Sequence, residues 1–337
     1  MGGHKKQHYI PKSYLKAWCD PCTPPGQEPY VWVFSKDGAL SQRKAPASIF
    51  HETEMYTIHL DDGGRDLVFE HGLAQLESDF AAIGGCATGA SRALNRDDTV
   101  RLVAFMAAMY LRTPAMRDHM AEQLDRAVAM MDEGSRWAKT ATPDQLAAAS
   151  SPLRPDAGTS ITYGELKDAA SHPLQTVLLP QVANLTQMLL QLDMAVLTAC
   201  ERSRFITSDF PCVWFDPEAY KRPPFYRSPG LGHPAIEVTF PISPGQMLLL
   251  NRKGVRGTIS VEDDLVDEYN RRTCLHCAKS FVNFENQTKA SWFDPGVMPA
   301  DSWENTRKHE RPAVLAKNRL RRRLKVWVEK LKHLVDR

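Results

Sequence analysis

The sequence lacks any long hydrophobic run. Its longest apolar stretch, residues 102–111, is shorter than the roughly 20 apolar residues of a membrane-spanning helix. The first residues contain no apolar segment typical of a secretory signal, and Lys6 stands where a myristoylation signal has Ser or Thr. We therefore expect a cytoplasmic protein with no membrane partner.

An excess of charge of one sign is also lacking. The formal net charge is only +2, so no overall field attracts the chain to nucleic acid or to anionic lipid. Hydrophobic residues make up 43% of the chain and charged residues 24%, which are ordinary values for a globular protein. The cysteine count is seven, an odd number that favours free thiols in a reducing compartment over a disulfide framework.

Common catalytic and cofactor motifs are missing as well. The sequence contains no P-loop, no G-x-S-x-G motif and no H-E-x-x-H motif. Two cysteine pairs, Cys19 with Cys22 and Cys274 with Cys277, have the spacing of zinc ligands. The pairs are far apart in the chain, and cysteines inside a helix commonly pack as small apolar residues, so the sequence disfavours a shared zinc site.

Hydrophobic periodicity predicts a mixed fold. Apolar residues at 69, 73, 76, 80 and 83 form one stripe along a helix. Further helices are expected over residues 95–111, 116–131, 173–192 and 262–284. Strand patterns occur at 30–34, 194–200, 204–207, 236–240 and 246–251. We predict an α+β fold, with a predominantly helical body packed on a small antiparallel β-sheet.

The composition along the chain indicates how the domain is organised. Residues 1–290 are expected to form a single α+β domain, in which residues 134–162 are a flexible insert with one short helix near 144–149. Residues 291–337 are expected to form an irregular linker and a basic amphipathic C-terminal helix. Such a helix could dock its leucine stripe on the domain, contact nucleic acid, or mediate a homo-oligomer.

The opening block, His8-Tyr9-Ile10-Pro11-Lys12-Ser13-Tyr14-Leu15, concentrates an imidazole, two phenols and a rigid proline. An imidazole titrates near neutral pH, so His8 is a candidate general acid or base. Alternatively, the block is an N-terminal plug in which the aromatic rings pack and His8 satisfies a backbone carbonyl group.

Two further charged residues are candidate site residues. Asp209 follows an apolar strand, where a carboxylate can serve as a base or metal ligand, or can form a local Asx turn. Arg112 ends an apolar helix and must be paired if it is buried. Glu77 or Glu70 could form a structural clamp with Arg112, or the guanidinium group could bind a phosphate.

Several motifs resemble a bacterial family of unknown function, DUF4238, in the order in which the family has them. They comprise the opening block, Val31–Phe34, Leu76-Glu77, Leu111–Pro114, Phe205–Pro211, Phe240–Pro244, and Asn270 with Ala278. The matches span roughly residues 7 to 285. Phe210 stands where the family usually has Asn, and Ile242 where it usually has Leu. The resemblance implies a fold and a set of matched positions, but no reaction.

Two functions are compatible with these residues. In the first, the protein hydrolyses a phosphodiester, as a nuclease would, in bacterial defence or as a toxin. His8, Asp209, Arg112 and Glu77 would then be catalytic, with Mg²⁺ or Mn²⁺ bound by Asp209, Glu77 and Glu70. The substrate would contact Tyr9, Lys12, Ser208 and Asn270. In the second, the protein is a non-catalytic module that recognises a protein or nucleic acid, and the same polar residues form a structural network.

Overall fold

The computed structural model describes residues 6–60, 62–87, 94–149, 161–200, 202–296, 299 and 301–302. The chain forms two compact units, one of residues 1–213 and 238–294, the other of residues 214–237 and 295–337. Among the described residues, no helix combines the length and the apolar character that crossing a bilayer requires.

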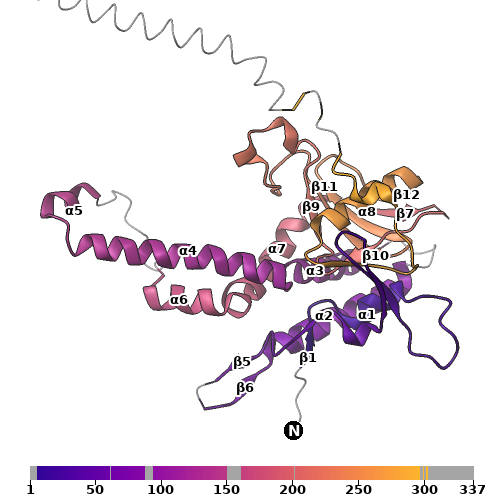
Figure 1. The fold of residues 1–337 in the computed structure, drawn as a ribbon, viewed down its shortest axis with the longest axis horizontal. Coiled ribbons are helices and arrows are strands. Elements are labelled where there is room, and N and C mark those ends of the chain that lie inside the picture. The colour runs from indigo at the N-terminus through magenta and orange to yellow at the C-terminus, as the bar shows by residue number, and fades with distance from the viewer. Residues whose placement is uncertain are drawn as a thin grey trace, which may run out of the picture. The chain divides into compact units, whose positions relative to one another are not determined.

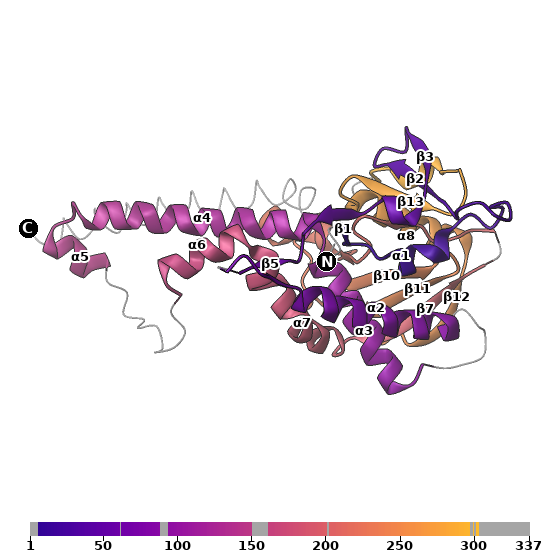
Figure 2. The ribbon, with the colours of Figure 1, turned by 90° about the horizontal axis from the view of Figure 1, so that it is seen from below.

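The first unit is mixed α+β (Figures 1 and 2). Its helices are α1 (Lys12–Leu15), α2 (Val68–Ala87), α3 (Arg96–Leu111), α4 (Pro114–Ala138), α5 (Pro143–Ala149), α6 (Tyr163–Ser171), α7 (Val182–Leu189) and α8 (Asp263–His276). Asn95 is the N-cap of α3, as the sequence predicts. Its side chain accepts a hydrogen bond from the Asp98 amide at 2.8 Å.

The strands form several sheets rather than one small antiparallel sheet. The largest runs in the order β12 (Gly257–Val261), β7 (Asp193–Ala199), β11 (Gln246–Asn251) and β10 (Glu237–Ser243) within the first unit. β11 pairs with β7 antiparallel, but β12 pairs with β7 in parallel, with Ile259 opposite Leu197. The parallel pair is possible because a long connection, which includes β10 and β11, separates β7 from β12 in the chain.

A second sheet has the order β3 (Ser41–Lys44), β2 (Val31–Ser35), β13 (Ser280–Asn283) and β8 (Thr207–Ser208). All its pairs are antiparallel, and Phe281 lies opposite Phe34 with the two rings stacked 5.1 Å apart. Two small ladders pair β1 (Lys6–His8) with β4 (His51–Thr53), and β5 (Ile58–His59) with β6 (Arg65–Asp66).

Three predicted segments differ in part from the observed elements. The helix expected over 262–284 ends at His276. The C-terminal part of this range forms strand β13 instead, which pairs with β2 on one edge and with β8 on the other. The expected insert over 134–162 begins inside α4, and α5 coincides with its short predicted helix. The helix near Pro180 is irregular, with π and 3-10 turns over residues 174–181.

The core of the first unit is built around Tyr14, whose side chain is fully buried. Its ring lies 4.9 Å from Trp18 and 5.3 Å from Phe240, and Phe80 of α2 stacks on Phe105 of α3 at 4.1 Å. This aromatic cluster joins the N-terminal helix, α2, α3 and β10 into one hydrophobic core.

Hydrogen bonds fix the N-terminal helix to both large sheets. The Tyr14 hydroxyl group lies 2.7 Å from Thr207 Oγ1 on β8, and it donates to the Pro241 carbonyl on β10 at 2.7 Å. The Trp18 indole donates to the Phe205 carbonyl at 3.0 Å. These buried groups satisfy one another, so the opening block is held in a single position.

The second unit contains the 3-10 turns η5 (Ala219–Lys221) and η6 (Pro224–Tyr226) in its described part. Arg222 donates to Asp216 at 2.6 Å and to the Tyr226 carbonyl at 2.9 Å, which joins the two turns. The expected basic C-terminal helix lies outside the described residues.

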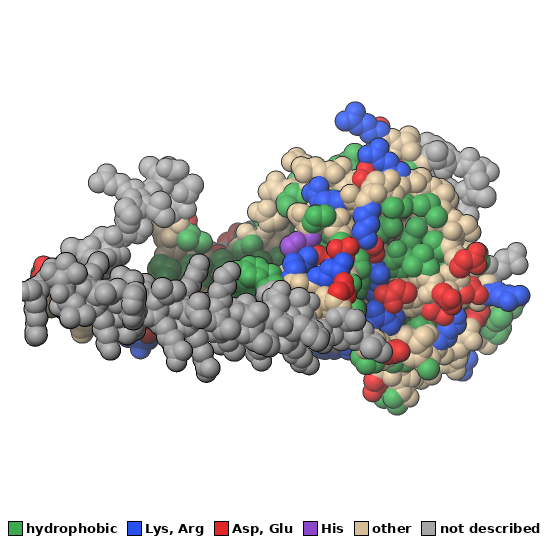
Figure 3. Space-filling view, turned by 90° about the horizontal axis from the view of Figure 1, so that it is seen from above, with side chains coloured by type: hydrophobic (Ala, Val, Ile, Leu, Met, Phe, Trp, Pro, Cys, Tyr) green, Lys and Arg blue, Asp and Glu red, His purple; other side chains and the backbone are tan. Residues whose placement is uncertain are grey.

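On the face shown in Figure 3, side chains of both signs are interspersed around an apolar area, in keeping with the small net charge.

The Tyr14→Phe variant tests the buried connection between the N-terminal helix and the sheets. Removing the hydroxyl group leaves the Pro241 carbonyl without its donor in a dry environment, so we expect a loss of about 1–3 kcal/mol in the free energy of unfolding. Urea denaturation monitored by circular dichroism measures it. The control is Tyr163→Phe, which removes an exposed hydroxyl bonded to Asp132 and should cost under about 0.5 kcal/mol. Equal effects of both changes would contradict the assignment.

Candidate functional site

A cavity of about 460 Å³ lies between the N-terminal segment and α2. It is lined by polar and charged side chains together with two apolar ones: Lys6, Gln7, His8, Lys12, Ser13, Lys16, Tyr56, Glu70, Leu73, Ala74 and Glu77. Its volume is in the range of sites that bind small molecules. The sequence predicted His8, Lys12, Glu70 and Glu77 as site residues, and the structure brings these four together here.

Local structure explains why these side chains converge. Lys12 and Lys16 are four residues apart across the α1 turn and the following 3-10 turn, so they share one side of that segment. On α2, Glu70 and Glu77 are two helical turns apart and flank Leu73, which is buried. His8 comes from β1, whose position is fixed by antiparallel pairing with β4.

The cavity has a cationic side and an anionic side. Lys6, Lys12 and Lys16 are exposed at its edge, whereas Glu70 and Glu77 of α2 are half-buried. Exposed ammonium groups that share one cavity attract a mobile anion. The half-buried carboxylates are in a less solvated environment, where their interactions with charged groups are stronger than in water.

His8 is uncharged at neutral pH. Its Nε2 atom lies 3.3 Å from the carbonyl oxygen of Ala47 and donates to it, and its ring contacts His51 at a centroid distance of 5.2 Å. Burial lowers the pKa of His8 to about 4, more than the Ala47 hydrogen bond raises it. The imidazole is therefore neutral at pH 7, with Nδ1 as a hydrogen-bond acceptor, and it has no additional proton to donate as a general acid.

Arg112 and Glu77 form the predicted clamp between two helices. The guanidinium NH1 donates to Glu77 Oε1 at 2.9 Å, and the Arg112 side chain is 1% exposed. Arg112 NH2 lies 2.9 Å from the sulfur of Met109, whereas the buried Nε has no partner among the described residues. Glu77 lines the cavity but Arg112 does not, so Arg112 positions the carboxylate from behind.

Gln7 is a cavity residue that the sequence analysis did not identify. It is 3% exposed, and its amide nitrogen donates to Thr57 Oγ1 at 3.0 Å and to Glu70 Oε2 at 2.7 Å. Its carbonyl oxygen accepts a hydrogen bond from the Tyr56 amide at 2.6 Å. Gln7 thereby fixes Glu70 at the cavity. A lone Gln in a short strand carries no sequence signal of this role.

Ser13 and Tyr56 complete the inner wall. The Ser13 hydroxyl group is buried and has no partner in the described part of the chain, and Tyr56 is 2% exposed. Burial raises the pKa of the Tyr56 phenol, so it stays protonated. Ser13 adjoins Lys12 in the opening block, so its position was available from the sequence, but its burial without a partner was not.

Asp209 is engaged elsewhere in the first unit. Its carboxylate is 5% exposed and accepts hydrogen bonds from the amides of Ala278, Lys279 and Ser280 at 2.8, 2.7 and 3.0 Å. Burial raises the pKa of Asp209, and these hydrogen bonds oppose that rise. The donors belong to the α8–β13 connection, so the carboxylate closes a long-range contact instead of the local Asx turn considered from the sequence.

The other predicted substrate-binding residues have structural partners. The Asn270 side chain donates to the Arg204 carbonyl at 2.8 Å and accepts from the Ile206 amide at 3.0 Å. Ser208 is fully buried and accepts from the Phe210 amide at 3.1 Å. The Tyr9 ring packs 5.8 Å from Phe50, and burial together with the charge of Asp209 raises its pKa.

The proposed metal ligands are divided between two places. Glu70 and Glu77 line the cavity, whereas both Asp209 oxygens accept backbone hydrogen bonds. Within the described ranges, no group of three or more His, Cys, Asp or Glu side chains is arranged to hold a metal ion. In this cavity, a divalent ion could therefore be bound by at most two carboxylates, those of Glu70 and Glu77 on α2.

The cysteine pairs carry no zinc geometry in the described residues. Cys274 and Cys277 are buried, and the Cys277 sulfur donates to the Cys274 carbonyl at 3.1 Å. Burial raises the pKa of Cys277 to about 12 and also raises that of Cys19, so these thiols are protonated and poorly nucleophilic at neutral pH.

The Glu77→Gln variant tests the clamp. Glutamine keeps the shape but leaves the buried Arg112 guanidinium without a counter-charge, so we expect a loss of about 2–3 kcal/mol in the free energy of unfolding. Urea denaturation at pH 7 measures this loss. The control is Glu122→Gln, since Glu122 pairs with Arg126 on the surface and should contribute under about 0.5 kcal/mol. A loss no larger than the control would contradict the clamp.

The pKa of His8 predicts how stability depends on pH. The folded value of about 4 is below the ordinary 6.5, so the unfolded chain binds a proton first as the pH falls. His8 therefore contributes stability above pH 6.5 that is progressively lost between pH 6.5 and pH 4. We expect His8→Gln to reduce the difference in unfolding free energy between pH 7 and pH 5. An unchanged difference for His8→Gln would contradict its burial as a neutral group.

Comparison with known proteins identifies a family but no function. Residues 6–288 match the family model described as protein of unknown function (DUF4238). No curated protein and no solved structure gives a significant match to the chain. The matched range contains the whole cavity, from Lys6 to Glu77, and also the loop of Asp209. The chain therefore belongs to the DUF4238 family.

Proposed function

We propose that the protein is a hydrolase that binds a small phosphodiester in the cavity between the N-terminal segment and α2. The observation that supports this most directly is the composition of the cavity wall. Three lysines, His8 and two glutamates surround one space of about 460 Å³. Cations can stabilise charge on phosphate oxygens and carboxylates can transfer protons, so both groups can assist this reaction.

The lysines supply the binding energy for the phosphate. Lys12 and Lys16 share one side of the N-terminal segment and Lys6 lines the same cavity from β1, so an anion in the cavity meets ammonium groups from two elements. The buried Ser13 hydroxyl group supplies a further donor for a phosphate oxygen. Because the lysines are exposed, we expect this binding to weaken as salt is added.

The carboxylates and His8 would handle the proton of the attacking water. Gln7 holds Glu70 and Arg112 holds Glu77, and each carboxylate keeps one oxygen that has no partner in the described part of the chain. Neutral His8 can accept a proton at Nδ1 but cannot act as the general acid at pH 7. A Mg²⁺ or Mn²⁺ ion bound by Glu70 and Glu77 together with substrate oxygens would stabilise charge on the phosphate.

In this proposal, the remaining predicted site residues act through the fold. Asp209 and Asn270 tie the segment around β8 to β13 and α8, Ser208 accepts a local hydrogen bond from the Phe210 amide, and Tyr9 packs against Phe50. Arg112 is a positioning residue for Glu77. The proposal retains a cytoplasmic location, a role in bacterial defence and nucleic-acid contact by the basic C-terminal residues.

A second candidate, a non-catalytic binding module, is favoured by one specific observation. The cavity contains no protonated imidazole at neutral pH, and its Glu77 carboxylate already pairs with Arg112. Such a wall can bind a phosphate ester without cleaving it. The two candidates share the ligand and differ in turnover, so one set of variants separates them.

Hydrolysis of bis(p-nitrophenyl) phosphate and of short DNA and RNA, with Mg²⁺ or Mn²⁺, tests the proposal. We expect Lys12→Ala to raise KM about fivefold through loss of one phosphate contact, with little change in kcat. We expect Glu70→Gln to lower kcat at least 100-fold while the ester still binds. Isothermal titration calorimetry measures that binding separately.

Lys139→Ala, at an exposed position beyond the end of α4, is the matched control and should change neither constant. Ester binding that depends on Lys12 without turnover in any condition would replace the hydrolase with the binding module. Turnover that is unaffected by both cavity changes would show that the chemistry takes place elsewhere.

A further inference from the structure

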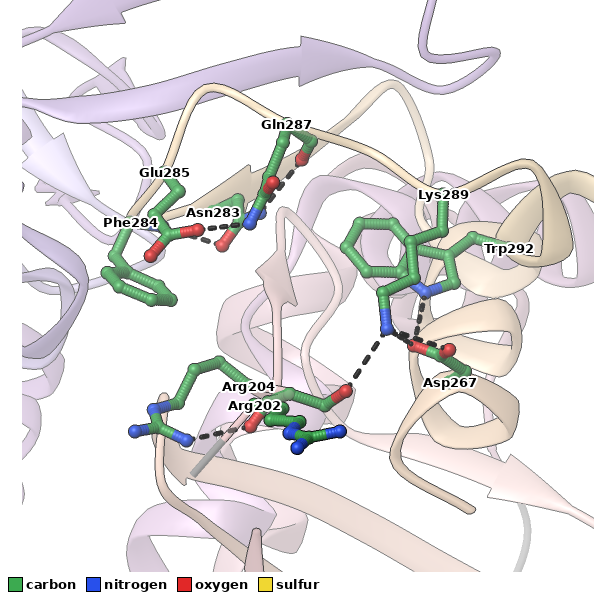
Figure 4. A pocket seen from close by; sticks show the side chains of 10 residues that line it. Arg202, Arg204, Asp267, Asn283, Phe284, Glu285, Gln287, Lys289 and Trp292 are labelled. Atoms are coloured by element: carbon green, nitrogen blue, oxygen red, sulfur yellow. Dashed lines mark hydrogen bonds and ion pairs between the residues drawn. The ribbon is translucent and has the colours of Figure 1, made fainter. Parts of the chain in front are cut away.

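A second cavity, of about 140 Å³, lies in the first unit between the segment before β8, α8 and the end of β13. Figure 4 shows its walls, with Arg202 and Arg204 on one side and Asn283, Phe284, Glu285 and Gln287 on the opposite side. Lys289, Trp292 and Asp267 form a third side. None of these residues belongs to the cavity of the proposed hydrolase.

The third side is rigid and electrically neutral. The Lys289 ammonium group lies 2.9 Å from both oxygens of Asp267 and donates to Ser203 Oγ at 3.1 Å. The Trp292 indole donates to Asp267 Oδ1 at 3.0 Å, and Trp292 and Ser203 are each 4% exposed. Since these charges and donors satisfy one another, this side fixes the shape of the cavity. The charge that a ligand meets in the cavity comes from the other two sides.

The arginine side offers unpaired donors. Arg202 has no hydrogen-bond or ion-pair partner among the described residues. Arg204 uses NH1 to donate to the carbonyls of Cys200 and Ser203, which orients the guanidinium group and leaves its other nitrogens available. Two guanidinium groups beside one small space form a site for a carboxylate or another oxyanion.

The opposite side offers a negatively charged hydrogen-bond acceptor. Glu285 accepts one hydrogen bond from the Gln287 amide group, and its other oxygen has no partner in the described part of the chain. Asn283 does not compete for a ligand, because its amide donates to the Gln287 carbonyl at 2.9 Å and its oxygen accepts from the Phe284 amide at 2.8 Å. Glu285 is thus the group that could hold a cation on this side.

The size and the two-sided charge together select the ligand class. A cavity of about 150 Å³ holds a molecule of benzene, so a space of 140 Å³ accommodates roughly six non-hydrogen atoms. A simple anion on the arginines would face the Glu285 carboxylate without a counter-ion. We propose that this cavity binds a small zwitterionic α-amino acid, with its carboxylate on Arg202 and Arg204 and its ammonium group on Glu285.

Isothermal titration calorimetry of the full chain with L-alanine tests the proposal, with acetate, methylammonium and inorganic phosphate as separate probes. We expect L-alanine to bind more tightly than acetate or methylammonium, because each of those engages one side only. Arg202→Gln and Glu285→Gln should each weaken L-alanine binding at least fivefold. Both positions are at the cavity edge and their changes should leave the thermal unfolding temperature within about 2 °C.

Arg126→Gln, an exposed arginine on α4, is the control and should leave L-alanine binding unchanged. The proposal is overturned if L-alanine does not bind, or if its binding is insensitive to Glu285→Gln. Phosphate or acetate binding that equals or exceeds that of L-alanine and depends on Arg202 alone would show a plain anion site, and would likewise overturn it. None of these results depends on phosphodiester hydrolysis in the other cavity.

Discussion

The buried hydroxyl group of Tyr14 is the contact on which the rest of the first unit depends. It bonds to β8 and to β10 at once, so a helix of only four residues is held against two sheets. The same helix carries Lys12 and Ser13 into the cavity, and β1 before it carries Gln7 and His8. The positions of Lys12 and Ser13 therefore depend on one buried phenol and the aromatic rings packed around it, whereas pairing of β1 with β4 fixes Gln7 and His8.

The polar residues of this protein divide into two sets with different physical roles. Those on α2 and the N-terminal segment face a cavity and retain free lone pairs or ammonium groups. Those near β8 and α8 have their hydrogen bonds taken up by backbone groups of distant segments, as Asp209 and Asn270 show. A family motif can be structural in this way, because a buried carboxylate that accepts three amides is costly to replace.

Sequence periodicity predicted much of the local structure because it depends on neighbours in the chain. The α2 stripe, the Asn95 cap of α3 and the Arg112–Glu77 pair all follow from helical spacing and from the need to pair a buried charge. The strand at residues 280–283 was missed because its apolar residues fit a helical period too, and only pairing with β2 and β8 selects the extended form. Likewise, no local pattern marks Gln7, whose role depends on Glu70 and Tyr56.

The sequence by itself determined the helical faces, the family and the candidate residues His8, Lys12, Glu70 and Glu77, since these depend on residue type and spacing. Only the tertiary structure decided that these four share a cavity while Asp209 does not, and that His8 is neutral at pH 7. It alone brought Arg202 and Glu285 to opposite sides of a second cavity. The reason is that burial and long-range hydrogen bonds, which set charge states and distances, arise between segments that the chain order keeps far apart.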